Sequence, residues 1–81
     1  MREFTYQYKG ETVESLYAIS VEKGSLRYKV KLGSDLWFTI TPLDIPGPDN
    51  MILWHQSNKD GEIIQPYDLV QAMGLGIEAS Q

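Results

Sequence analysis

The side chains that could perform chemistry are few in this sequence. The 81 residues contain no cysteine and one histidine, His55, which excludes thiol nucleophiles and the common cysteine-based zinc sites. His55 is the one conventional general base near neutral pH. It follows Trp54 in a short apolar segment, and no GxSxG or similar nucleophile signature accompanies it. We therefore expect His55 to perform no catalysis.

Three other segments resemble ligand sites only in part. Residues 58–62 (NKDGE) begin like a calcium loop, but the twelfth position is Leu69 where an EF-hand has glutamate, and Asp-Gly is a common hairpin turn. Residues 74–76 (GLG) fall late in a predicted helix, whereas a phosphate site opens a helix after a strand. Asp44, Asp49 and Asn50 are only weak evidence for a cation site. We expect no metal and no cofactor.

The segment RYKVKL, residues 27–32, is the clearest candidate for a binding surface. Arg27, Lys29 and Lys31 alternate with Tyr28, Val30 and Leu32, which is the period of a half-buried strand. The three basic side chains therefore share one face of that strand, and the apolar side chains share the other.

The flanking residues predict the register of this strand with its neighbours. If Lys23-Gly24 is a two-residue turn, Tyr17 faces Val30, and every large apolar side chain of the hairpin lies on one side. If residues 33–35 form a three-residue loop, Val30 also faces Phe38. A two-residue loop would place Lys31 opposite Leu36, which is less favourable. The three-residue loop puts Trp37 and Thr39 on the polar face, so the candidate partner-binding residues are Arg27, Lys29, Lys31, Trp37 and Thr39.

Outside these strands the pattern predicts a short strand at each end of the sheet. Residues 4–8 alternate apolar and polar side chains and turn at Lys9-Gly10 into residues 12–14. Residues 51–56 form a short apolar strand, and residues 62–64 can pair back to it across a turn. Because residues 42–50 contain three prolines, we expect an irregular connection there.

The C-terminal segment changes to a helical period. Leu69, Val70, Met73 and Ile77 form one apolar stripe, and Pro66 and Asp68 suit the start of a helix over about residues 66–79. Glycine costs about 1 kcal/mol relative to alanine in a helix, so we expect the last turns to fray or the helix to end at Gly74.

These elements predict one α+β domain over residues 1–81. It is an antiparallel meander of five or six strands with the C-terminal helix packed on its apolar face, and whether the sheet curls towards a barrel is left open. The predicted core is the apolar set of this register: Tyr17, Ile19, Val21, Tyr28, Val30, Phe38, Ile40, Leu69 and Met73.

The composition and charge of the chain restrict the cellular location and the kinds of partner that we expect. The net charge of −4 disfavours nonspecific nucleic-acid binding, although residues 1–31 carry a balance of +2 and residues 32–81 a balance of −6. There is no apolar run of membrane-span or signal-peptide length, so we expect a soluble, cytoplasmic protein without membrane contact.

Three functional classes follow from these observations. The first is a protein-binding or self-associating module that uses the polar face around Trp37, because Trp and Arg are enriched at interfaces. The second is a nucleic-acid-binding module that uses Arg27, Lys29 and Lys31 with Trp37. The third and weakest is an enzyme centred on His55. A plain solvated face remains the simplest interpretation of the basic strand, since lysine on a strand discourages aggregation.

Overall fold

A computed structural model describes residues 1–33, 36–48, 51–57 and 63–81. It confirms the predicted α+β fold, with five antiparallel strands in the order β1-β2-β3-β4-β5 and one C-terminal helix. No helix among the described residues is long and apolar enough to cross a membrane. The elements are β1 (Arg2–Tyr8), β2 (Glu11–Glu22), β3 (Ser25–Leu32), β4 (Leu36–Ile45), β5 (Met51–Gln56) and α1 (Tyr67–Ser80).

The registers predicted around β3 are confirmed. Tyr17 pairs with Val30 across β2 and β3, and Val30 pairs with Phe38 across β3 and β4. At the turn between β2 and β3, Lys23 and Gly24 both have positive φ, at 50° and 79°, as a two-residue type I′ turn requires. Residues 34 and 35 of the predicted three-residue loop lie outside the described residues.

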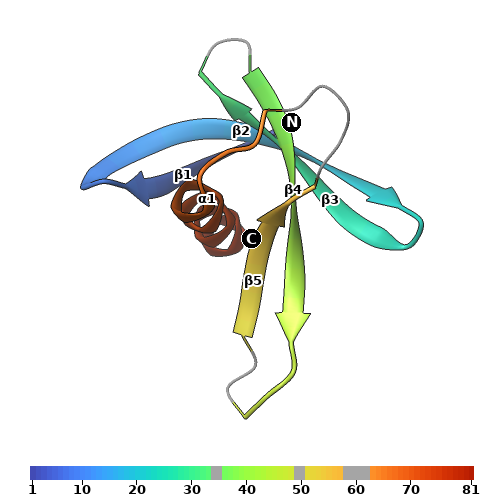
Figure 1. The fold of residues 1–81 in the computed structure, drawn as a ribbon. Coiled ribbons are helices and arrows are strands. Elements are labelled where there is room, and N and C mark those ends of the chain that lie inside the picture. Colours follow the sequence, from blue (N-terminus) through green and yellow to red (C-terminus); the bar gives the residue numbers. More distant parts are fainter. Residues whose placement is uncertain (34–35, 49–50, 58–62) are drawn as a thin grey trace.

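The sheet curls so that its two edge strands, β1 and β5, both lie against the helix (Figure 1). We call the face of the sheet towards the helix the inner face and the opposite one the outer face. The predicted helical stripe is buried, together with Tyr17, Tyr28, Val30, Phe38 and Ile40. The core also contains residues that were not predicted, namely Phe4, Tyr6 and Trp54.

The prediction that the helix frays or ends at Gly74 is wrong, because the helix continues to Ser80. A Cβ atom on Gly74 would lie 2.1 Å from Cγ of Trp54, and one on Gly76 would lie 2.3 Å from the Thr5 carbonyl oxygen. The two glycines therefore let the helix approach β5 and β1 closely, and this packing offsets their low helix propensity.

The helix also satisfies part of the free edge of β5. The Trp54 backbone N–H donates to Oε1 of Gln71 at 3.0 Å, and Nε2 of Gln71 donates to the Trp54 carbonyl oxygen. The Gln71 amide thus takes the place that a neighbouring strand would have. On the inner face, the Trp54 indole N–H donates to Oε1 of Glu78 at 3.0 Å.

Two of the nine predicted core residues are exposed, so that part of the core prediction is wrong. Ile19 is 40% exposed and Val21 is 65% exposed, although both lie on the inner face in the predicted register. The cause is the reach of the helix. Its end contacts the hydroxyl groups of Tyr17 and Tyr28 through Ser80 and Gln81, and the hairpin of β2 and β3 extends beyond that point.

The connection between β4 and β5 is more regular than predicted. β4 continues through Pro42 to Ile45, so residues 42–45 are not an irregular connection. Pro42 is tolerated because it pairs with Trp54, whose backbone groups point away from β4 to Gln71. Its own nitrogen therefore points towards β3, whose pairing with β4 stops at Tyr28 and Ile40.

The predicted strand at residues 62–64 is wrong for its described part. Ile63 and Ile64 are not in a strand, and the Gln56 side chain instead bonds the backbone of Ile63 and Gln65. The predicted turn at residues 57–61 and the calcium-like sequence lie outside the described residues apart from Ser57, as do Asp49 and Asn50.

Candidate binding surface

The five candidate residues lie together on the outer face, across β3 and β4. Lys29 pairs with Thr39, and Lys31 pairs with Trp37. Directly opposed residues share a face, so these side chains point away from the helix, on the side opposite Val30 and Phe38. We call this set (Arg27, Lys29, Lys31, Trp37 and Thr39) the Trp37 face.

Trp37 is the centre of the Trp37 face. Its indole is half-buried, and the ammonium groups of Lys29 and Lys31 lie 5.9 and 5.8 Å from its centroid. Each cation–π contact of this kind contributes about 0.5–1 kcal/mol at an exposed site. The two lysines flank the indole and hold it in a defined position within a single chain.

Arg27 is held by neighbours, unlike the two lysines. Its Nη1 donates to Oγ1 of Thr41 at 2.9 Å and to Oγ of Ser57 at 3.3 Å, and its Nε lies 4.0 Å from a carboxylate oxygen of Glu22. This Nε atom is buried and has no hydrogen-bond partner among the described residues. Arg27 therefore joins the ends of β3, β4 and β5 and borders the Trp37 face as a fixed charge.

Thr39 contributes little surface to the Trp37 face. Its side chain is only 3% exposed, because β4 is flanked there by Lys29 on β3 and by Ser57 just after β5, whose N–H donates to the Thr39 carbonyl oxygen at 2.8 Å. Thr39 supports the centre of the face, and Lys29, Lys31 and Trp37 provide its more accessible side chains.

The charged side chains of residues 32–81 that the structure describes lie away from the Trp37 face. Asp68 and Glu78 are on the helix, and Asp44 pairs with Ile52 on the inner face. The positive stripe and these three acidic groups are therefore on opposite sides of the sheet. Among the described residues, the outer face also carries Glu3 and Glu14 on β1 and β2, so the positive charge is local to the Trp37 face.

His55 is exposed on the outer face, opposite Thr41. It borders a small hollow of about 210 Å³ together with residues from the end of β5 and the start of the helix. Tyr67 is the other titratable side chain lining this hollow, and the lining residues include no serine, carboxylate or lysine. Among the described residues, the lining thus offers His55 no serine, cysteine or lysine nucleophile.

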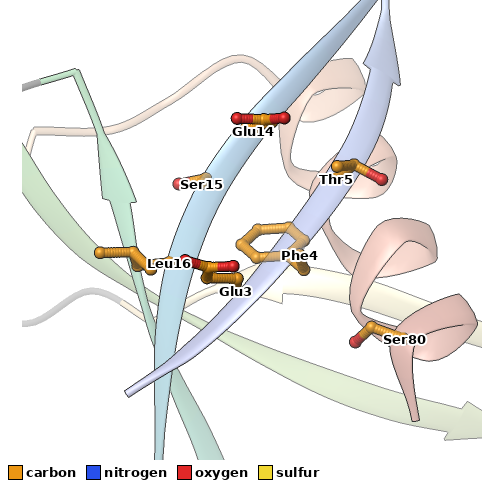
Figure 2. Close-up of a pocket in the computed structure, with 7 residues that line it drawn as sticks. All are labelled: Glu3, Phe4, Thr5, Glu14, Ser15, Leu16 and Ser80. Carbon is orange, nitrogen blue, oxygen red and sulfur yellow. The ribbon is translucent and has the colours of Figure 1, made fainter.

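A larger hollow of about 530 Å³ runs along β1 and β2 (Figure 2). Two carboxylates, Glu3 and Glu14, lie on its lining, and Ser80 at the end of the helix borders it. Among the described residues, no group of three or more side chains could hold a metal ion. Two carboxylates on paired strands give this hollow a negative lining.

Two core tyrosines have shifted acidities. Burial raises the pKa of Tyr6, and the neighbouring Tyr8 adds to this shift. A hydrogen bond with Ser80 lowers the pKa of Tyr17 against the opposing effect of burial. Both side chains lie on the inner face beneath the helix, so these shifts describe core packing and not the Trp37 face.

An exposed apolar surface at the end of the β4–β5 hairpin was not predicted from the sequence. Directly opposed pairs place Leu43 with Leu53 and Ile45 with Met51 on the outer face, and Ile52 lies on the inner face at the edge. The exposed fractions are 50% for Leu43, 41% for Ile45, 59% for Met51 and 47% for Ile52. Continuing the register of β4 and β5 across Pro42 would have revealed these pairs.

Comparison of the chain with protein-family models, with curated proteins and with solved structures found no match in any of the three.

Proposed function

We propose that this protein is a non-catalytic module that binds another protein through the Trp37 face. The single observation that carries the proposal is the position of Trp37. A large indole lies on the outer face, where the helix does not cover it, and two lysines flank it. An indole is typical of the anchor of an interface, and the rim around such an anchor is polar and accessible to solvent.

Two further features support a protein partner. The Trp37 side chain is in contact with two cations, which restrict its motion and reduce the conformational entropy lost when a partner covers it. The positive rim of Lys29 and Lys31 also favours an acidic partner, because complementary charge accelerates association.

A nucleic acid is the second candidate, favoured by one observation. Three basic side chains alternate along β3 beside an indole, and single strands are bound by stacking on aromatic side chains and by phosphate contacts. The net charge of −4 acts against it, and Arg27 already donates to Thr41 and Ser57. We therefore place the protein partner first.

A paired capture experiment tests the proposal. The wild type, the double variant Trp37→Ser/Lys29→Glu and the control Leu75→Ser/Lys9→Glu are immobilised and exposed to an extract of the source cells. Leu75 and Lys9 are exposed and lie away from the Trp37 face, so the control replaces a large apolar side chain by serine and a lysine by glutamate elsewhere on the surface. Any captured protein is then purified and titrated against the three chains.

We expect a protein that binds the wild type and the control and loses at least about tenfold in affinity, about 1.4 kcal/mol, for the Trp37→Ser/Lys29→Glu variant. A parallel titration with a thymidine oligonucleotide follows tryptophan emission at low and high salt, and the Trp37→Ser/Lys29→Glu variant gives the contribution of Trp54. Salt-sensitive oligonucleotide binding without a captured protein would assign the face to nucleic acid. Equal capture by all three chains would contradict the proposal.

A further inference from the structure

The free edge of β5 is divided into a capped part and an open part. At Trp54 both outward backbone groups bond the Gln71 side chain. Near the end of the strand, the Gln56 side chain bonds the backbone of Ile63 and Gln65 and occupies the space beside it. Ile52 is two residues before Trp54 and 47% exposed, and the helix does not cap it.

The backbone groups of Ile52 point in the same direction as those of Trp54. Hydrogen-bonding direction alternates along an antiparallel strand, so residues two apart face the same side. Ile52 pairs with Asp44 on β4, as Trp54 pairs with Pro42. The N–H and C=O of Ile52 therefore face away from β4, and no hydrogen bond between the described residues engages them.

The side chains around this open edge are apolar on both faces. Met51 and Leu53 lie on the outer face beside Ile45 and Leu43, and Ile52 lies on the inner face. Residues 51–57 contain no aspartate, glutamate, lysine or arginine. Natural edge strands are usually protected from pairing by such charges or by a covering element. Among residues 1–33, 36–48, 51–57 and 63–81, none gives the edge at Ile52 either protection.

We propose that the open edge of β5 binds a second copy of this chain as an antiparallel strand, centred on Ile52. In this dimer each Ile52 N–H donates to the Ile52 carbonyl oxygen of the other copy, because an antiparallel pair on the two-fold axis exchanges both hydrogen bonds. Met51 of each copy then lies opposite Leu53 of the other. The two sheets become one continuous sheet.

Self-complementarity is the reason for choosing a second copy as the occupant. Apolar side chains meet apolar side chains at every position of the three-residue overlap, and no like charges oppose each other within it. The nearest acidic groups on that row are the two Asp44 side chains. They would be three strand spacings apart, about 14 Å, which exceeds the Debye length of about 8 Å at physiological salt.

The structure also limits the assembly to a dimer. The overlap ends where Gln71 caps Trp54, so the pairing cannot extend along the strand. The other edge strand, β1, lies against the helix. Pairing through β5 therefore forms a closed two-fold assembly and not a fibre. The short overlap is smaller than a standard stable interface, and we expect a Kd between about 1 μM and 1 mM.

The dimer has one consequence that rests on the proposed function. The two-fold axis of an antiparallel edge pair is perpendicular to the sheet, so both Trp37 faces lie on the same side of the dimer. A partner with two matching sites would then bind more tightly than a partner with one, through the higher effective concentration at the second site. The dimer itself does not depend on this consequence.

Sedimentation equilibrium tests the dimer across about 10 μM to 1 mM, the range set by the expected Kd. Four chains are compared: wild type, Ile52→Val, Ile52→Pro and Trp37→Ser. Proline at position 52 removes only the outward N–H, because that donor makes no bond to β4, and proline is tolerated at such edge positions. Circular dichroism verifies the fold of each chain. If Ile52→Pro does not fold, Ile52→Lys replaces it and sets like charges against each other on the axis.

We expect the wild type, Ile52→Val and Trp37→Ser to rise from the monomer mass of 9.2 kDa towards twice that value. Ile52→Pro or Ile52→Lys should remain monomeric, with at least a tenfold weaker association. A wild type that is monomeric at the highest concentration would overturn the dimer and leave the edge to a strand of another protein. A dimer lost in Trp37→Ser and kept in Ile52→Pro would overturn it in favour of self-association through the Trp37 face.

Discussion

Two regions of the sheet differ in burial: the part beneath α1, and the ends of the β2–β3 and β4–β5 hairpins beyond it. Both regions follow the same alternation of apolar and polar side chains. Val30 is fully buried and Val21 is 65% exposed, although both are valines on the inner face of one hairpin. The helix contacts β1, β4 and β5, and its end reaches only to Tyr17 and Tyr28. Alternation along a strand therefore decides which side a residue faces, and the length and position of the helix decide whether that side is covered.

The largest effect on stability is expected at Val30, with Val21 as the comparison. Val30→Ala should lower the free energy of unfolding by about 2 kcal/mol or more, since it removes buried methyl groups and leaves a cavity. Val21→Ala, at an exposed position, should change it by less than about 0.5 kcal/mol, and Lys29→Ala by no more than about 1 kcal/mol, the value of its contact with Trp37. Denaturant midpoints of the three variants measure the contrast. Equal losses at Val30 and Val21 would mean that the hairpin end is also covered.

The approach of the helix to β5 can be tested at Gly74. Gly74→Ala should destabilise the protein by about 1–3 kcal/mol, because the new Cβ would overlap the Trp54 indole. Helix propensity alone would give the opposite sign, a gain of about 1 kcal/mol. Thermal or denaturant unfolding decides between them, with Leu75→Ala as the exposed control on the same helix. A stabilised Gly74→Ala variant would contradict the close contact.

The cap on the edge of β5 should have a smaller effect. Gln71→Ala should cost about 1 kcal/mol, the net value of a typical hydrogen bond, because water can replace the side-chain amide at this edge. Gln7→Ala, which changes an exposed glutamine of β1, serves as the control. Exchange of the Trp54 amide hydrogen should accelerate in Gln71→Ala and not in Gln7→Ala. Unchanged protection of Trp54 would show that another group holds it.

The smallest effect is expected at His55. His55→Gln should leave the fold intact and change partner binding by no more than a few-fold, because His55 is exposed and its neighbours provide no catalytic pair. Unfolding curves and the capture experiment with the Trp37 face measure this. If the variant kept its fold and lost a measured activity by orders of magnitude, His55 would have to be assigned a catalytic role.

The register of the strands could be predicted from the sequence. Which parts of the sheet the helix buries could not. The strict alternation of Tyr28, Val30 and Leu32 leaves one pairing in which large apolar side chains meet, so the arrangement of Trp37 beside Lys31 was predictable. The exposure of Ile19 and Val21 was not, because it depends on where a helix far along the chain ends. The burial of Thr39 likewise depends on Ser57, a contact between β4 and the end of β5 that the local pattern does not contain.

Gly74 and Pro42 illustrate the same limit. Each was interpreted through its intrinsic propensity, and in each case a tertiary contact with Trp54 decided the outcome. A glycine weakens a helix unless a close neighbour needs the space, and a proline interrupts a strand unless its missing N–H would face an unpaired side. Neither condition can be derived from a single sequence before the topology is known.

The central claim is that the helix covers one part of the sheet and leaves the hairpin ends open. Amide hydrogen exchange at Ile52 and Trp54 tests it most directly. The exchange is measured by NMR at a concentration where the chain is monomeric. The two residues lie on one edge of β5, and their N–H groups point in the same direction. The Trp54 amide should be strongly protected by Gln71, and the Ile52 amide should exchange at nearly the rate of an unstructured chain. Equal protection of the two amides, or fast exchange at Trp54, would contradict this account.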